Sequence, residues 1–121
     1  MRTLLKILCL VSLYSIISCD DILEVPDISN ASVTILAPTQ GVVVDTTTIN
    51  FSWESVIDAE QYQLQIATPT FETARQIIRD TILEEISFST TLTADDYEWR
   101  VRALNSEFAT RYTVVPFTVI E

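Results

Sequence analysis

The sequence has no histidine, one glycine, two cysteines and a single lysine, and these shortages exclude several classes of function. Without histidine there are no histidine-dependent catalytic triads, none of the commonest zinc sites and no usual general base near neutral pH. Hydrolysis would depend on two carboxylates placed across a cleft, and no calcium-binding Asp-x-Asp-x-Asp-Gly run occurs either. We therefore expect no catalytic site, no metal site and no cofactor.

Basic residues are also scarce. The chain carries 17 acidic and only 7 basic residues. A chain this acidic repels nucleic-acid phosphates and anionic lipid. We therefore expect neither nucleic-acid binding nor electrostatic attachment to a membrane.

Only one long hydrophobic run is present, over residues 4–17. Arg2 and Lys6 form its positive front. The run is shorter than the roughly 20 residues of a membrane-spanning helix and has the length of a signal peptide. We expect it to be cleaved.

The run ends in Ile16-Ile17-Ser18-Cys19, where a small residue stands directly before a cysteine. This junction resembles the lipobox of bacterial lipoproteins. The resemblance implies that residues 1–18 are a lipoprotein signal peptide and that Cys19 becomes the lipidated first residue. The alternative is an ordinary secretory signal with a chance cysteine near its end.

Lipidation would place the protein in a bacterial cell envelope, held to the membrane through lipid on Cys19. Cys9 would leave with the signal, so no disulfide would be available and the domain would rely on its apolar core. Asp20 and Asp21 resemble the acidic sorting signals that follow the lipidated cysteine in some Gram-negative bacteria. Such signals lead to the cell surface in one group and to inner-membrane retention in another. We expect the protein to be attached to the outer membrane, and the sequence leaves open whether it lies on the periplasmic or the surface face.

The mature chain has the size of one domain. Removing residues 1–18 leaves 103 residues with five arginines and all 17 acids, a formal charge of −12. This length is too short for two independent cores. Residues 19–32 comprise the cysteine that the resemblance implies is lipidated and an acidic tether, which is predicted because the stretch follows no hydrophobic period and includes four acids. We predict a folded domain over residues 33–121.

From residue 33 onward the hydrophobic period is two. Hydrophobic and polar residues alternate over 49–53, 62–66 and 97–103, and each stretch predicts a half-buried antiparallel strand. Seven or eight short strands, with no helix after the signal, predict an all-β antiparallel sandwich. The shorter candidate strands cover residues 33–37, 42–44, 76–82, 86–90 and 113–120.

Several motifs in this order are typical of one family: Pro38-Thr39-Gln40-Gly41, Phe51-Ser52-Trp53-Glu54, Tyr62-Gln63-Leu64-Gln65-Ile66-Ala67, Tyr97-Glu98-Trp99-Arg100-Val101-Arg102-Ala103 and Pro116-Phe117-Thr118-Val119. Through them, residues 33–121 resemble a fibronectin type III domain. The resemblance implies an immunoglobulin-like β-sandwich of about seven strands.

The aromatic residues of these motifs are candidate core residues. Trp53 and Trp99 would each bury a large apolar surface, and each indole N–H would need an acceptor. The resemblance implies that Tyr97 forms a tyrosine corner, with its hydroxyl bonded to the backbone across residues 92–96. It also implies that Phe71 folds back onto the core.

Two surfaces are candidates for binding a partner. Arg100 and Arg102 would point outward from the strand at 97–103, beside Gln63 and Gln65. The family's sheet order would bring Arg75 and Arg79 to or near the same face. These arginines would either pair with Glu98 and other cross-strand acids, or receive an acidic partner or sugar hydroxyls.

The second candidate surface is the predicted hairpin at residues 105–111, where Phe108 and Arg111 form an aromatic and cationic pair. Such residues are enriched among those that dominate binding energy. The resemblance implies that this hairpin and the loop at 54–61 lie at the same end as the N-terminus and face the membrane.

The sequence therefore predicts a lipid-anchored binding or spacer module without catalytic activity, which contacts an envelope protein near the membrane. The alternative is a carbohydrate-binding accessory lipoprotein of a glycan-processing system. A row of exposed aromatic side chains would favour the carbohydrate alternative.

Overall fold

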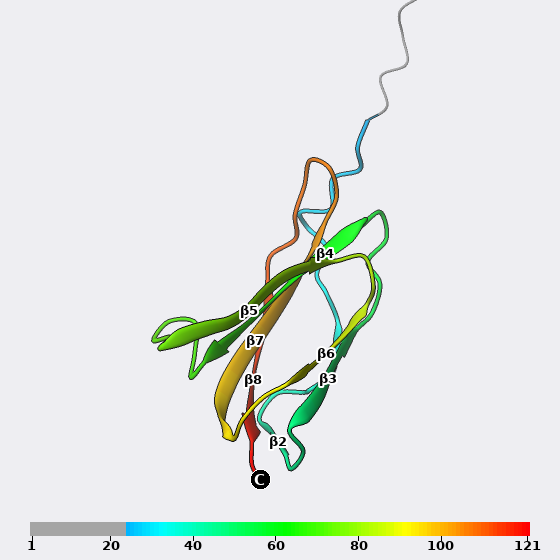
Figure 1. Ribbon diagram of the computed structural model, residues 1–121. Helices are drawn as coiled ribbons and strands as arrows, with labels where there is room; N and C mark the ends of the chain where they lie inside the picture. The colour runs from blue at the N-terminus through cyan, green and yellow to red at the C-terminus, as the bar shows by residue number, and fades with distance from the viewer. Residues whose placement is uncertain (1–23) are drawn as a thin grey trace, which may run out of the picture.

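The computed structural model describes residues 24–121, and eight strands account for most of their regular structure (Figure 1). The strands begin and end within two residues of the predicted ones, which confirms the predicted all-β fold. In chain order they are β1 (Ile35–Ala37), β2 (Val42–Val44), β3 (Thr48–Trp53), β4 (Gln61–Thr68), β5 (Gln76–Leu83), β6 (Ser87–Thr91), β7 (Asp95–Leu104) and β8 (Thr113–Val119).

The strands form two sheets that pack face to face (Figure 1). One sheet has the order β1-β3-β6 and the other the order β2-β8-β7-β4-β5. All pairs are antiparallel except β2 and β8, which run parallel. The chain changes sheets between β1 and β2, where Gly41 has a φ of 74° that favours glycine. Its N–H donates to the carbonyl oxygen of Pro116 at 2.8 Å.

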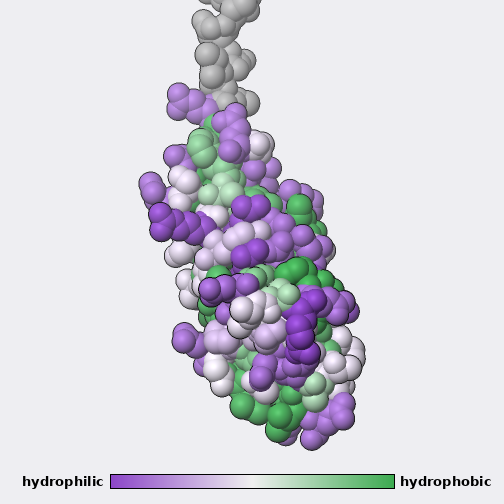
Figure 2. Space-filling view, turned by 90° about the vertical axis from the view of Figure 1, so that its left-hand side faces the viewer, coloured by the Kyte–Doolittle hydropathy of each residue, from purple (hydrophilic) through white to green (hydrophobic). Residues whose placement is uncertain are grey.

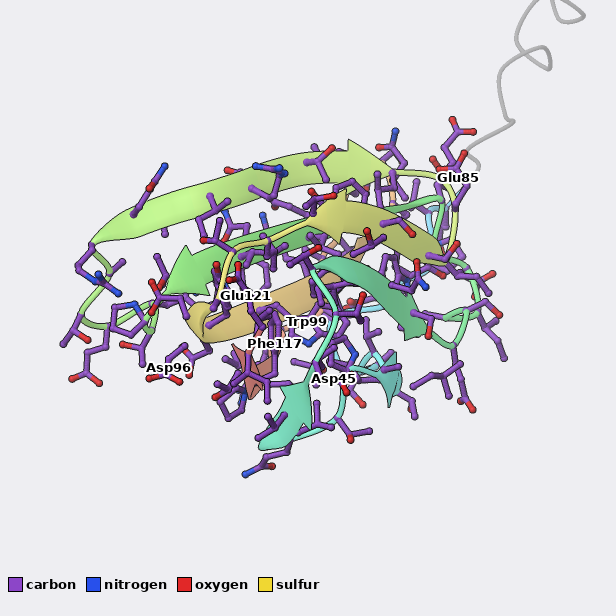
Figure 3. The ribbon with its side chains drawn as sticks, turned by 60° about the horizontal axis from the view of Figure 1, so that its bottom comes forward. Asp45, Glu85, Asp96, Trp99, Phe117 and Glu121 are labelled. Carbon is purple, nitrogen blue, oxygen red and sulfur yellow. The ribbon has the colours of Figure 1, made fainter. Side chains whose placement is uncertain are left out.

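The core lies between the sheets and consists of alternate residues of the long strands. Phe51, Trp53 and Trp99 are fully buried, and Trp99 and Phe117 both pack edge-on against Phe51. Figure 3 shows Trp99 and Phe117 between the layers, whereas Glu85 and Asp96 lie at the rim. Aromatic pairs of this kind contribute about 0.5–1.5 kcal/mol each beyond the area they bury.

The two indole N–H groups differ in their partners. Trp99 Nε1–H donates to the carbonyl oxygen of Pro38 at 3.3 Å. Trp53 Nε1–H is buried and has no hydrogen-bond partner among the described residues. The expectation of an acceptor is therefore confirmed for one tryptophan and wrong for the other.

The tyrosine corner is confirmed. Tyr97 is 3% exposed, and its hydroxyl donates to the backbone carbonyl of Thr93 at 2.6 Å. Its ring stacks on Phe117, with centroids 5.5 Å apart. The corner therefore joins the turn before β7 to the core.

The packed part of the chain reaches further toward the N-terminus than residue 33. Ile28 is 4% exposed and belongs to the core, although it lies within the predicted tether. Asn105 Nδ2 donates to the carbonyl oxygen of Pro26 at 2.8 Å, which joins this segment to the last hairpin. The predicted signal peptide, Cys19 and the start of the tether lie outside the described residues.

Candidate functional site

Arg100 and Arg102 lie on the outer face of the five-stranded sheet. They alternate along β7 with buried residues, so their side chains take the opposite face. The register places Arg100 opposite Gln65 and Arg102 opposite Gln63 on β4. The sequence prediction of these four neighbours is confirmed.

The glutamines hold the two guanidinium groups in fixed positions. Arg100 Nε donates to Gln65 Oε1 at 2.7 Å, and Arg102 donates through Nε and Nη2 to Gln63 Oε1 at 3.0 and 2.7 Å. Gln63 Nε2 donates in turn to Asp80 Oδ1 at 3.0 Å. Hydrogen bonds from Gln63 and then Gln65, with the nearby arginine charges, lower the pKa of the Asp80 carboxyl. The glutamines therefore separate the two cations from this carboxylate.

Two aromatic rings stack against the guanidinium groups. The Arg100 carbon Cζ lies 4.0 Å from the centroid of the Phe71 ring and 4.2 Å from that of Tyr112. Arg102 Cζ lies 4.7 Å from the Tyr112 centroid. The Phe71 backbone N–H donates to Glu98 Oε1 at 3.0 Å, which fixes the loop that carries this ring. We define the arginine face as Gln63, Gln65, Phe71, Asp80, Arg100, Arg102 and Tyr112.

Two members of the arginine face were not expected there. Phe71 packs on Arg100 and not on the core, so its predicted core position is wrong. Tyr112 was missed, although a signal existed. The β7–β8 register pairs Arg100 with Val114. Continuing this register by one more residue beyond the pair of Val101 and Thr113 places Tyr112 opposite Arg102.

The other two arginines leave this face. Arg79 lies opposite the buried Ile66 and donates through Nε and Nη2 to Thr90 Oγ1 on β6, at 3.1 and 2.9 Å. Opposed residues of a strand pair share a face, so Arg79 points toward the other sheet. Arg75 pairs with Asp95 at 3.1 Å, the only ion pair within residues 24–121. The expectation of four arginines at one face is wrong.

The aromatic side chain of the last hairpin is partly committed to the core of the domain. Phe108 is half-buried and packs against the core, and its backbone N–H donates to Asn105 Oδ1 at 2.8 Å. Arg111 is exposed. Asn105 Nδ2 also lies 3.4 Å from the carbonyl oxygen of Asp58. The hairpin, the loop before β4 and the N-terminal segment therefore share one end, as predicted (Figure 1).

An apolar groove of about 350 Å³ lies between β1, β2 and β3. Figure 2 shows hydrophobic residues gathered at the end of the molecule opposite the N-terminus, the end where β2 lies. No titratable side chain lines the groove. The groove therefore offers no pair of carboxylates for acid–base chemistry. Its lining residues are Leu36, Ala37, Pro38, Thr39, Val42, Val44, Thr46, Thr48, Ile49 and Asn50.

Within residues 24–121, no group of three or more cysteine, aspartate or glutamate side chains is arranged to hold a metal ion. The same residues include no helix that is long and apolar enough to cross a membrane.

No protein-family model matches the sequence, and no curated protein matches it. Several solved structures do resemble it. The fibronectin(III)-like modules of CbhA from Clostridium thermocellum are 13% identical, with a TM-score of 0.53 over 72% of this chain and 94% of that one. The fibronectin type III domain of human collagen alpha-1(XX) is 15% identical, with a TM-score of 0.55 over 86% and 93%. A fibronectin type III-like protein from Clostridium thermocellum is 15% identical, with a TM-score of 0.50 over 74% and 90%. With two sheets in the orders β1-β3-β6 and β2-β8-β7-β4-β5, the chain has the fibronectin type III fold.

Proposed function

We propose that this protein is a lipid-anchored, non-catalytic binding module of a bacterial cell envelope, and that it contacts an envelope protein through its arginine face. One observation carries the proposal. Arg100 and Arg102 are ordered by glutamines and aromatic rings, yet neither forms an ion pair within residues 24–121. In such an acidic chain, two fixed arginines that pair with no acid of residues 24–121 favour a role toward another molecule.

Anchoring through Cys19 would keep this face close to a membrane. Pro26, whose carbonyl oxygen accepts a hydrogen bond from Asn105, is the seventh residue after Cys19, and seven extended residues span at most about 25 Å. The last hairpin would then face the membrane, and the arginine face would lie along the side of the sandwich. A partner in the same envelope layer could reach that side.

The proposal favours a protein partner over a glycan. Flat aromatic rings that are open to the ligand would favour a sugar-binding surface. On this face, the rings of Phe71 and Tyr112 are covered by guanidinium groups. Carbohydrate binding in a glycan-processing system is therefore the less favoured function.

Site-specific crosslinking in intact cells tests the contact surface. A photo-crosslinking amino acid at Ile82, which is exposed and lies opposite Gln63, should capture a protein partner. The same amino acid at the exposed Thr91 of β6 is the matched control on the other sheet. Arg100→Glu with Arg102→Glu should abolish the Ile82 crosslink. If crosslinks form only from position 108 or 111, the hairpin is the contact surface and the proposal fails.

Metabolic labelling tests the anchor. Cells grown with a clickable fatty acid should label the wild-type protein and not the Cys19→Ala variant. The motivating observation is the Ile16-Ile17-Ser18-Cys19 junction. Equal labelling of the two proteins would contradict lipidation at this residue.

A further inference from the structure

The two guanidinium groups of the arginine face keep most of their donors unused. Arg100 donates only through Nε, and Arg102 only through Nε and Nη2, in each case to a glutamine oxygen. A guanidinium has five N–H groups in a planar fork. Among the described residues, the remaining N–H groups of both arginines have no acceptor. These cations can therefore still bind an anionic group.

Aromatic rings lie beside both guanidinium groups of the arginine face. Tyr112 contacts both arginines, whereas Phe71 is tied to Glu98 on the other side of Arg100. Rings and cations therefore alternate along β7 in the order Phe71, Arg100, Tyr112, Arg102. Arg100 therefore lies against two rings and Arg102 against one. The N–H groups of a guanidinium point outward in its plane, so the unused donors of both arginines lie at the edges of these groups. An edge is the part of a guanidinium that binds a carboxylate through two parallel hydrogen bonds.

The spacing of the two arginines matches that of an extended polypeptide. They stand two residues apart on β7, a separation of about 7 Å along the strand. Alternate side chains of an extended peptide repeat at the same distance. We infer that the arginine face binds an extended segment of a partner protein with aspartate or glutamate at alternate positions. This inference rests on the proposed function and names the chemistry of its partner.

The carboxylates near the two arginines restrict which anions fit. Asp80 accepts a hydrogen bond from Gln63, and Glu98 accepts one from the Phe71 backbone. Both carboxyl groups lie close to the arginines and would repel a polyanion of high charge density. An acidic segment with neutral residues between its carboxylates avoids that repulsion. The surroundings therefore favour alternating acids over a continuous acidic run.

Fluorescence anisotropy with defined peptides tests the inference. The full chain, purified in a neutral detergent, is titrated into a rhodamine-labelled dodecapeptide of alternating glutamate and threonine. At 150 mM salt the Debye length is about 8 Å, which screens the rest of the acidic surface but not direct contacts. We expect saturable binding, and at least tenfold weaker binding of the matched peptide with glutamine in place of glutamate.

Variants of the chain distinguish binding at the arginine face from a general effect of net charge. Arg100→Gln with Arg102→Gln should weaken peptide binding at least tenfold. Arg111→Gln changes the charge equally in the last hairpin and should change the affinity less than twofold. Arg100→Lys keeps the charge but lacks the planar fork, so binding at wild-type strength would overturn the edge-on geometry. If the double variant unfolds at a lower temperature, Arg102→Gln decides, because that side chain contacts only one ring.

Each remaining outcome has a defined meaning. Absence of peptide binding at millimolar concentration would overturn the inference, and the proposed function would survive if the Ile82 crosslink still depended on the arginines. Binding of polygalacturonate without binding of the peptide would replace the polypeptide by an acidic glycan. If the wild-type protein neither binds the peptide nor forms the Ile82 crosslink, the inference and the proposed function are both refuted.

Discussion

The two tryptophans of this protein form a matched pair of core positions for one substitution. Both side chains are fully buried, but only Trp99 Nε1–H has an acceptor, the Pro38 carbonyl at 3.3 Å. Trp53→Phe and Trp99→Phe each remove the same atoms from a packed environment. We expect this shared apolar loss to destabilise each variant by about 1–3 kcal/mol.

The polar contributions of the two substitutions have opposite signs. Trp99→Phe loses a hydrogen bond, which costs about 0.5–1.5 kcal/mol, and leaves the Pro38 carbonyl without this donor. Trp53→Phe instead removes a buried donor without a partner, whose desolvation costs about 1–3 kcal/mol in the native protein. Because 3.3 Å is long for a hydrogen bond, we take a value near the lower end when the two polar contributions are added. Trp53→Phe should be more stable than Trp99→Phe by about 2 kcal/mol.

Urea unfolding of the chain from Asp20 onward measures this difference. Far-ultraviolet circular dichroism follows the sheets, and the single tryptophan that each variant retains reports on the core. For a domain of this size, a difference of about 2 kcal/mol corresponds to roughly 8–16 °C in melting temperature. Equal midpoints for the two variants, or a lower midpoint for Trp53→Phe, would refute the hydrogen-bond argument.

Three further predictions concern single side chains. Tyr97→Phe keeps the ring but loses the bond to the Thr93 carbonyl, so it should lower the free energy of unfolding by about 1–3 kcal/mol in a urea titration. The pKa of Asp80 is lowered in the folded state, chiefly by the Gln63 hydrogen bond, so its ionised form stabilises the fold above about pH 4. That contribution disappears as the pH falls through the lower folded-state pKa. Between pH 5 and pH 2, the free energy of unfolding, measured in urea, should therefore fall less for Asp80→Asn than for the wild type. Equal falls for the two proteins would contradict a stabilising role of the Asp80 carboxylate. Asn105→Ala should speed amide hydrogen exchange over residues 24–31, measured by mass spectrometry, and unchanged exchange there would show that this side chain does not hold the segment.

The fold was predictable because alternation determines which face a strand residue occupies. Tyr97, Trp99 and Val101 are buried, and the arginines between them lie outside, as the period of two requires. The immunoglobulin-like sandwich itself came from the family resemblance, and the solved fibronectin type III structures share this fold.

Residues in loops and irregular pairs were not predictable in the same way. Phe71 lies between β4 and β5, where no periodic pattern fixes the direction of a side chain, and a bond from its own N–H to Glu98 sets its place. Ile28 is an isolated hydrophobic residue in an acidic stretch, so nothing in its neighbourhood indicates burial. The position of Arg79 depends on pairing, because a register shift beside it between Ile66 and Ala67 changes the alternation of β5.

The parallel pairing of β2 and β8 gives the domain a direction of mechanical resistance. Val42, Val43 and Val44 lie beside Phe117, Thr118 and Val119, and two bonds of 2.8 Å flank the pair, from the Gly41 N–H to the Pro116 carbonyl and from the Ile120 N–H to the Val44 carbonyl. The N-terminal segment enters at one end of the sandwich and β8 finishes at the other (Figure 1). Tension between those ends would pull β2 and β8 past each other along their length. Their hydrogen bonds would then bear the load together instead of opening one after another, so the sandwich would transmit a pull from one end to the other while staying folded.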